Sequence, residues 1–128
     1  MSMKGNYIIL EEGLLRDDKI RDLIEVRGFE GLGVYISLLT LIRGYSESDY
    51  RIPWNEVRKI SRWDLLMPEE ELRGFIDSCI ACNLFKADDR FFWSDRRRND
   101  LKKQDEVRRK QKEGGKKGAY RRYEQEEE

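Results

Sequence analysis

One stretch of sequence, residues 28–43, constrains the fold more than any other. If it is helical, apolar side chains fall at 32, 35, 36, 39 and 42 on one face and at 34, 38, 41 and 45 on the next. A helix that is apolar on two faces has to be surrounded by other elements and cannot lie on a surface. We therefore predict that residues 30–44 form the central helix of a small domain and that Gly44 ends it.

The segment before this helix predicts another one. The apolar run at residues 7–10 is either a strand or an arm packed on the core. Asp17 or Asp18 can cap a helix that Gly28 stops, because a carboxylate accepts from free N–H groups and glycine tolerates the conformation that ends a helix. Its inward-facing residues are Ile20, Leu23 and Ile24.

Two further helices are expected after it. Residues 50–52 read as a short strand, and Pro53 then opens a helix that ends near Arg62. Pro68 opens the next helix, and Asn83 is its left-handed stop. The apolar face of this helix consists of Leu72, Phe75, Ile76, Cys79 and Ile80.

A β-hairpin is expected next. Residues 84–87 and 90–93 are apolar-rich runs on either side of an Asp88-Asp89 turn. Ser94 can cap a last helix. The order of elements predicts a mainly α fold with a small β-hairpin wing. More specifically, it predicts a winged helix-turn-helix with an extra N-terminal helix and a projecting basic C-terminal helix.

The charges are unevenly distributed, although the net charge is zero. Residues 1–94 carry 13 Lys/Arg and 17 Asp/Glu, whereas residues 95–122 carry 13 Lys/Arg and 5 Asp/Glu. Such an asymmetry indicates a polyanionic partner. We predict a winged-helix domain at 1–94 and, at 95–128, a basic helix that frays by Gly114 into a disordered tail.

Several classes of function are disfavoured. The chain has no histidine, no apolar run long enough to span a membrane, and an N-terminus without the apolar core of a signal peptide. Cys79 and Cys82 have neither the partners for a zinc site nor the helix-start position of a redox motif, so we interpret Cys79 as a buried structural residue. We expect a cytoplasmic protein that is not an enzyme, binds no cofactor or metal, takes no small-molecule substrate and contacts no membrane.

The clustered glycines and the tryptophans have structural interpretations. The spacing of Gly28, Gly31 and Gly33 does not fit a phosphate-binding loop, so we expect Gly28 to end one helix and the other two to allow close packing. The three tryptophans could stack on bases, but core and edge positions explain them more simply. They are Trp54, Trp63 and Trp93.

The basic segment is the candidate binding site. Its clusters can neutralise phosphates and release counterions, which gives affinity with little sequence choice. Helical spacing distributes them over several faces, and Tyr120 and Tyr123 could stack on exposed bases. The alternative is a solubilising tail. The candidate nucleic-acid-binding residues are Arg96, Arg97, Arg98, Lys102, Lys103, Arg108, Arg109, Lys110, Lys116, Lys117, Arg121 and Arg122.

The helix before the hairpin does not suit DNA. In a DNA-reading winged helix it would enter the major groove, but here it carries Glu69, Glu70, Glu71 and Asp77 and offers only Arg73 as a cation. Its carboxylates would be repelled by phosphates. We therefore expect the domain to hold a protein and the C-terminal segment to hold nucleic acid.

The sequence also resembles the N-terminal domain of phage and prophage replication-initiation proteins, the DnaD-like replisome organisers, and their uncharacterised relatives. The resemblance covers residues from about 7 to 120. It rests on Asp18-Lys19-Ile20, Gly28 to Tyr35 with Leu38-Leu39, Tyr50-Arg51-Ile52, Asn83-Leu84-Phe85 and Gly114 to Ala119. It implies a winged-helix domain that self-associates or contacts replication proteins, and it implies no catalytic residue.

Three hypotheses follow. The first is a replication accessory protein, homo-oligomeric or bound to replication proteins, whose basic segment binds DNA non-specifically. The second is a protein-interaction module with a solubilising tail and no nucleic-acid role. The third, ranked lowest, is a sequence-specific repressor that would read bases with Arg73, Lys86 and Arg90.

Overall fold

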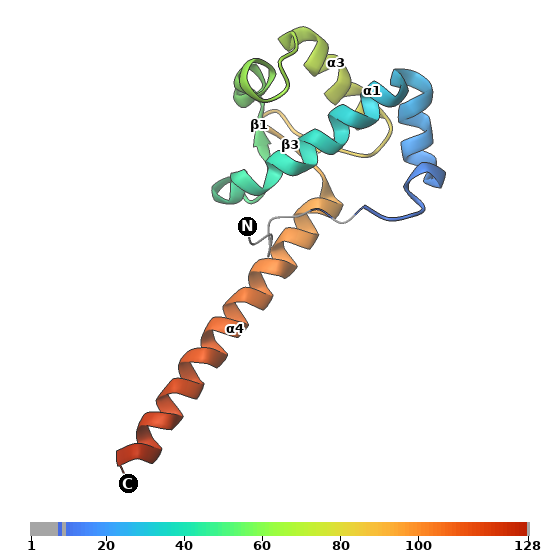
Figure 1. Cartoon of the computed structure of the whole chain (residues 1–128). Coiled ribbons are helices and arrows are strands. Elements are labelled where there is room, and N and C mark those ends of the chain that lie inside the picture. Colours follow the sequence, from blue (N-terminus) through green and yellow to red (C-terminus); the bar gives the residue numbers. More distant parts are fainter. Residues whose placement is uncertain (1–7, 9, 128) are drawn as a thin grey trace. The chain divides into compact units, whose positions relative to one another are not determined.

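The computed structural model describes residues 8 and 10–127, with side chains described as far as Lys112. The chain divides into two compact units, residues 1–98 and residues 99–128. Residues 7 and 9 of the predicted strand or arm at 7–10 lie outside the described residues, and residues 8 and 10 are in no regular element. The elements are η1 (Leu14–Arg16), α1 (Asp18–Ile42), η2 (Arg43–Ser48), β1 (Ile52–Pro53), η3 (Trp54–Glu56), α2 (Val57–Lys59), η4 (Ile60–Asp64), α3 (Glu69–Ala81), β2 (Lys86–Ala87), β3 (Phe91–Trp93) and α4 (Asp95–Glu127) (Figure 1).

The first helix begins and breaks where the sequence predicts. The Asp17 carboxylate accepts the N–H groups of Lys19 at 2.9 Å and Ile20 at 3.3 Å, which otherwise lack helical partners. Gly28 has φ 67° and ψ −170°, a combination open almost only to glycine, and it divides α1 into two helical segments. The predicted cap and stop are therefore confirmed.

The second part of α1 is the central helix, although it is less enclosed than predicted. Its buried residues are Gly31, Leu32, Val34, Tyr35, Leu38, Leu39 and Ile42. Gly33 and Thr40 are exposed, so one strip of the helix faces solvent. The predicted end at Gly44 is wrong, because the α-helix ends at Ile42 and the chain continues as the 3-10 helix η2 to Ser48.

The segment between β1 and α3 is helical in three successive short pieces. The predicted helix from Pro53 to Arg62 is seen as η3, α2 and the π-helical η4, which together run from Trp54 to Asp64. The next predicted helix is α3, whose buried face contains Leu72, Phe75, Ile76 and Cys79. Asn83 has φ 62°, so the predicted left-handed stop is also confirmed.

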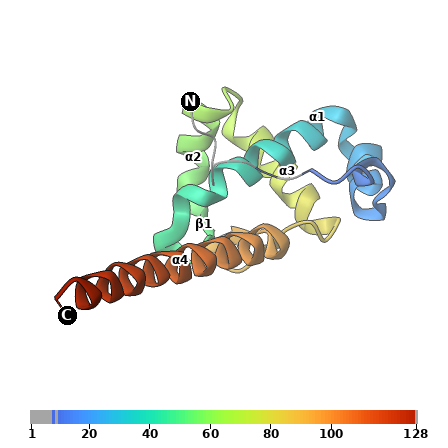
Figure 2. The same cartoon turned by 60° about the horizontal axis from the view of Figure 1, so that its bottom comes forward.

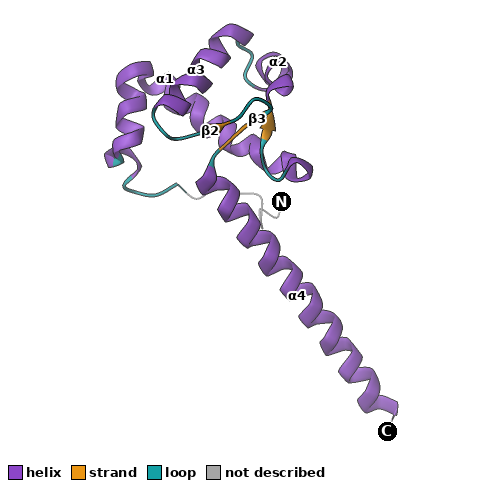
Figure 3. Cartoon of the chain, turned by 180° about the vertical axis from the view of Figure 1, so that it is seen from behind, coloured by secondary structure: helices purple, strands orange, loops and turns teal. Residues whose placement is uncertain are grey.

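The predicted hairpin forms and gains a third strand. Asp88 accepts the N–H groups of Arg90 at 2.8 Å and Phe91 at 2.7 Å, and these bonds hold the pKa of its carboxyl below the ordinary value. In the sheet β3 lies between β1 and β2, both antiparallel to it, with Ile52 opposite Phe92 (Figure 3). The fold is thus mainly helical with a small three-stranded antiparallel sheet.

Arg27 links α1 to α3, which pack against each other (Figure 2). Its guanidinium donates to Ser78 Oγ at 2.8 Å and to the Gly74 carbonyl at 3.1 Å, and lies 5.1 Å from the centre of the Phe75 ring. A Cβ on Gly31 would lie 2.4 Å from the Cβ of Arg27. The close-packing interpretation therefore holds for Gly31, whereas a Cβ on Gly33 would meet nothing within 4 Å.

The last helix, α4, extends beyond the predicted fraying point. It runs from Asp95 to Glu127 without a break at Gly114. Lysine, arginine, glutamate and glutamine have high helix propensity and dominate its sequence, which favours continuation in spite of the glycines. Within the described part of the chain, no helix combines the length and the apolar character needed to cross a membrane.

Candidate nucleic-acid interface

The start of α4 is held by residues of the first unit. The Ser94 hydroxyl accepts the N–H of Arg97 at 3.2 Å, as expected for a capping serine, and Ser94 is buried. Asp95 pairs with Lys86, N to O 2.5 Å, and accepts Trp93 Nε1 at 2.9 Å. The hydrogen bond from Lys86 is the largest cause that holds the pKa of Asp95 below its ordinary value.

Arg97, a predicted nucleic-acid contact, lies in the interior of the first unit. Only 7% of the surface of Arg97 is exposed, and its Nε donates to the Leu39 carbonyl at 3.3 Å. Leu39 is in the last turn of α1, where carbonyls lack helical partners and the helix dipole favours a cation. Arg97 thus caps the C-terminal end of the central helix and is not available to phosphates in this structure.

Its two neighbours are also engaged within the first unit. Arg98 donates from Nε to the Asp49 carbonyl at 2.8 Å and pairs with the Asp49 carboxylate. Asp49 itself has a left-handed conformation, φ 58°, where η2 ends. Arg96 pairs with Glu11 and remains mostly exposed. The predicted triplet therefore fastens the start of α4 to the first unit.

The basic residues of α4 between residues 99 and 112 are exposed. Those that the sequence predicts as contacts are Lys102, Lys103, Arg108, Arg109 and Lys110, and Lys112 shares their exposure. Their distribution over several faces agrees with the prediction, but spacings of seven and three residues place Lys102, Arg109 and Lys112 on one face. That face extends about 15 Å along the helix, at a rise of about 1.5 Å per residue.

The exposed cations of α4 differ in their partners. Asp105, Arg108, Arg109 and Lys112 line a shallow surface depression of about 440 Å³. Lys110 instead points to Glu106 one turn earlier, N to O 3.9 Å, so part of its charge is already neutralised. Lys116, Lys117, Arg121 and Arg122 belong to α4, but their side chains lie outside the described residues.

The excess of positive charge in the C-terminal part of the chain is smaller when this part begins at residue 99, where the structure divides the chain, instead of at residue 95. Residues 99–122 carry 10 Lys/Arg against 4 Asp/Glu. A cationic segment remains, and it begins with Lys102.

The first unit carries a cationic surface that sequence reasoning missed. Arg58, Lys59 and Arg62 are exposed on the segment from α2 to η4. Trp63 follows them with 73% of its surface exposed, so its interpretation as a core or edge residue is wrong. The sequence pattern could have predicted this surface. Val57, Ile60 and Ser61 form the buried side of the segment, and the charged positions between them face outward.

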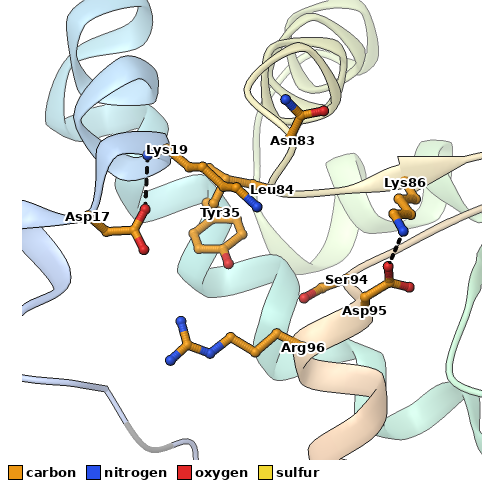
Figure 4. Close-up of a pocket in the computed structure, with 9 residues that line it drawn as sticks. All are labelled: Asp17, Lys19, Tyr35, Asn83, Leu84, Lys86, Ser94, Asp95 and Arg96. Atoms are coloured by element: carbon orange, nitrogen blue, oxygen red, sulfur yellow. Dashed lines mark hydrogen bonds and ion pairs between the residues drawn. The ribbon is translucent and has the colours of Figure 1, made fainter.

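A pocket in the first unit offers a second place for a ligand (Figure 4). It has a volume of about 280 Å³ and is lined by Asp17, Lys19, Tyr35, Asn83, Leu84, Lys86, Ser94, Asp95 and Arg96. Its charged groups serve the fold: Asp17 caps α1, Lys86 pairs with Asp95, and Arg96 pairs with Glu11. Burial raises the pKa of Tyr35 to about 12, so its hydroxyl stays protonated.

The cysteines behave as the sequence predicts. Cys79 is fully buried, and burial raises the pKa of its thiol to about 12, which suppresses the thiolate needed for metal binding or redox chemistry. Burial also raises the pKa of Cys82. Among the described residues, no cluster of metal-ligating side chains is present.

These features define a small, mainly helical domain with a three-stranded antiparallel sheet, followed by a long basic helix. The family model described as "Lin1244/Lin1753-like, N-terminal" matches residues 7–96, and the chain belongs to this family. The match does not extend to DnaD-like replication proteins, so that part of the resemblance stays a proposal. No curated protein and no solved structure matched the chain.

Proposed function

We propose that this protein binds DNA without sequence preference through α4, and that its first unit is a winged-helix domain that holds a protein partner in replication of the phage type. The exposed cations on one face of α4, Lys102, Arg109 and Lys112, carry the DNA part of the proposal. The replication setting rests on the sequence resemblance alone.

The arrangement of elements supports a winged-helix architecture. A helix, a strand, two helical segments and a hairpin follow one another in the chain, and β1 pairs with the hairpin strand β3. In this scheme β2 and β3 are the wing. The position of a reading helix falls to α3, where Glu70, Glu71 and Asp77 are exposed and would repel phosphates. This disfavours the repressor hypothesis and leaves DNA binding to α4.

The DNA affinity of such a face depends strongly on salt. Three neutralised phosphates give a slope of about −2.7 in log K against log salt concentration. Between 50 and 200 mM salt the affinity then falls roughly forty-fold. Because the contacts are to phosphates, we expect the same fall for any duplex sequence.

Two adjacent residues give a matched test. Arg109 lies in the cationic depression, whereas Lys110 is already paired with Glu106. Binding of the full chain to fluorescent single- and double-stranded DNA is measured by anisotropy over a range of salt concentrations. We expect Arg109→Ala to reduce the salt slope by about 1 and Lys110→Ala to reduce it clearly less. Equal slopes for both variants, or a slope in the wild type near zero, would contradict the proposal.

A second function, protein binding without any nucleic-acid role, is favoured by the surface of the first unit. Trp63 and Leu66 expose large apolar side chains next to the acidic start of α3. Aromatic residues are enriched at protein interfaces. If light scattering shows an assembly that survives nuclease treatment while no DNA probe binds, this second function replaces the first.

A further inference from the structure

The turn between η4 and α3 exposes two large apolar side chains. Trp63 is 73% exposed and Leu66 is 82% exposed. Leu66 also has φ 50°, a left-handed conformation that a bulky residue rarely adopts and that costs about 1–3 kcal/mol. Such strain persists only where the surrounding structure imposes it, and it concentrates at functional surfaces.

Main-chain hydrogen bonds impose this conformation. The N–H of Leu65 donates to the Ile60 carbonyl at 3.0 Å, and the N–H of Met67 donates to the Ser61 carbonyl at 2.9 Å. Ser61 is buried, and its hydroxyl donates to the Arg58 carbonyl at 2.8 Å. The turn is therefore fixed at both ends, so the two apolar side chains are displayed on a defined surface.

Opposite charges lie on the two sides of this apolar pair in the chain. Arg58, Lys59 and Arg62 are exposed before it, and Glu70 and Glu71 are exposed after it. Asp64, which lies between the two apolar residues in the chain, is exposed as well. Glu69 is partly neutralised by Arg73, N to O 3.5 Å. The exposed positions of residues 58–71 thus run along the chain from cationic, through an apolar pair with one carboxylate between its members, to anionic.

We propose that residues 58–71 form the interface with a second copy of this chain. In a two-fold symmetric dimer each surface meets itself in reverse, so the cations of one copy face the carboxylates of the other twice over. The apolar pairs then meet near the axis, where their burial supplies most of the attraction. Arg58 and Arg62 lie opposite Glu70 and Glu71 of the second copy.

Charge complementarity selects this occupant over nucleic acid. A polyanion would gain from the cationic side but would be repelled by the exposed glutamates of α3, whereas a second copy satisfies both sides. The inference deepens the protein-binding role proposed above for the first unit and is independent of DNA binding by α4.

Charge exchange provides the test. One variant of the full chain carries Arg58→Glu and Arg62→Glu, a second carries Glu70→Arg and Glu71→Arg, and a third carries all four changes. Sedimentation equilibrium measures the mass of each. We expect the wild type to be a dimer and each of the first two variants to dissociate at least tenfold more readily, because like charges then face each other twice.

Recovery of the dimer by complementary charge changes is the decisive result. An equimolar mixture of the first two variants restores opposite charges on both sides and should form a heterodimer, and the third variant should again form a homodimer. The matched control, Glu25→Arg with Glu30→Arg on exposed positions of α1, should leave the wild-type mass unchanged. Far-UV circular dichroism and the melting temperature identify any variant that has failed to fold.

Three outcomes would overturn the inference. They are a monomeric wild type, a mixture of charge variants that stays monomeric, and a third variant that stays monomeric while folded. If the first variant instead loses DNA binding and the third does not regain it, the surface belongs to nucleic acid. Failure of the α4 proposal is seen separately, because Arg109→Ala would then leave the salt slope of DNA binding unchanged, whatever the mass measurements give.

Discussion

Replacement of Arg97 by alanine should destabilise the first unit without acting on DNA directly. The guanidinium of Arg97 donates to the Leu39 carbonyl at 3.3 Å and is buried with it. Loss of a hydrogen bond from a charged donor costs about 1.5–3 kcal/mol. We therefore expect a loss of about 2 kcal/mol in the free energy of unfolding.

The assay is urea or thermal unfolding followed by tryptophan fluorescence, since the indole N–H of Trp54 donates to the Asp88 carbonyl in the hairpin turn and that of Trp93 donates to Asp95 at the start of α4. For a domain of this size, about 2 kcal/mol lowers the melting temperature by roughly 10 °C. Arg97→Lys keeps the charge and a hydrogen-bond donor group, so it should lose less stability than Arg97→Ala. Arg109→Ala is the matched control and should leave the melting temperature unchanged. An Arg97→Ala variant as stable as the wild type would refute the capping role of this residue.

Further predictions concern the glycines and alkaline pH. Gly28→Ala should cost about 1–3 kcal/mol because its backbone conformation suits only glycine, and Gly31→Ala should also destabilise because its Cβ would lie 2.4 Å from that of Arg27. Gly33→Ala has open space and should stabilise by up to about 1 kcal/mol, so urea unfolding of the three variants should separate them in sign. Burial raises the pKa of Cys79 from 9.0 to about 12, so the unfolded state loses this proton first and stability should fall between pH 9 and 12, by up to about 1.4 kcal/mol per pH unit. The fall should be shallower in Cys79→Ala, and parallel curves would contradict it.

Features that depend on neighbouring residues were predictable from the sequence. The Asp17 cap, the Gly28 break, the Asn83 stop, the Asp88 turn and the Ser94 cap all involve contacts within three or four positions. Such contacts form in almost any tertiary setting, so residue type and spacing are sufficient to predict them.

Features that depend on distant contacts were not predictable in the same way. The exposure of Trp63 follows from how the η4 turn is held, and the pairing of Arg98 with Asp49 joins residues 49 positions apart. One feature of the sequence did indicate that Arg97 faces inward. The spacing 94, 97 and 101 places it on the same helical face as the capping Ser94 and the aliphatic Leu101.

The arginines at the start of α4 illustrate why a count of charges cannot define a binding site. Cations in the first turn of a helix face the positive end of its dipole, which costs roughly 0.3–1 kcal/mol each. Arg97 and Arg98 offset that cost by reaching the last turn of α1 and the carboxylate of Asp49. Their charge is therefore explained by folding alone. Lys102 and Arg109 lie beyond the first turn and are exposed, so these positions are where selection for a polyanion would act.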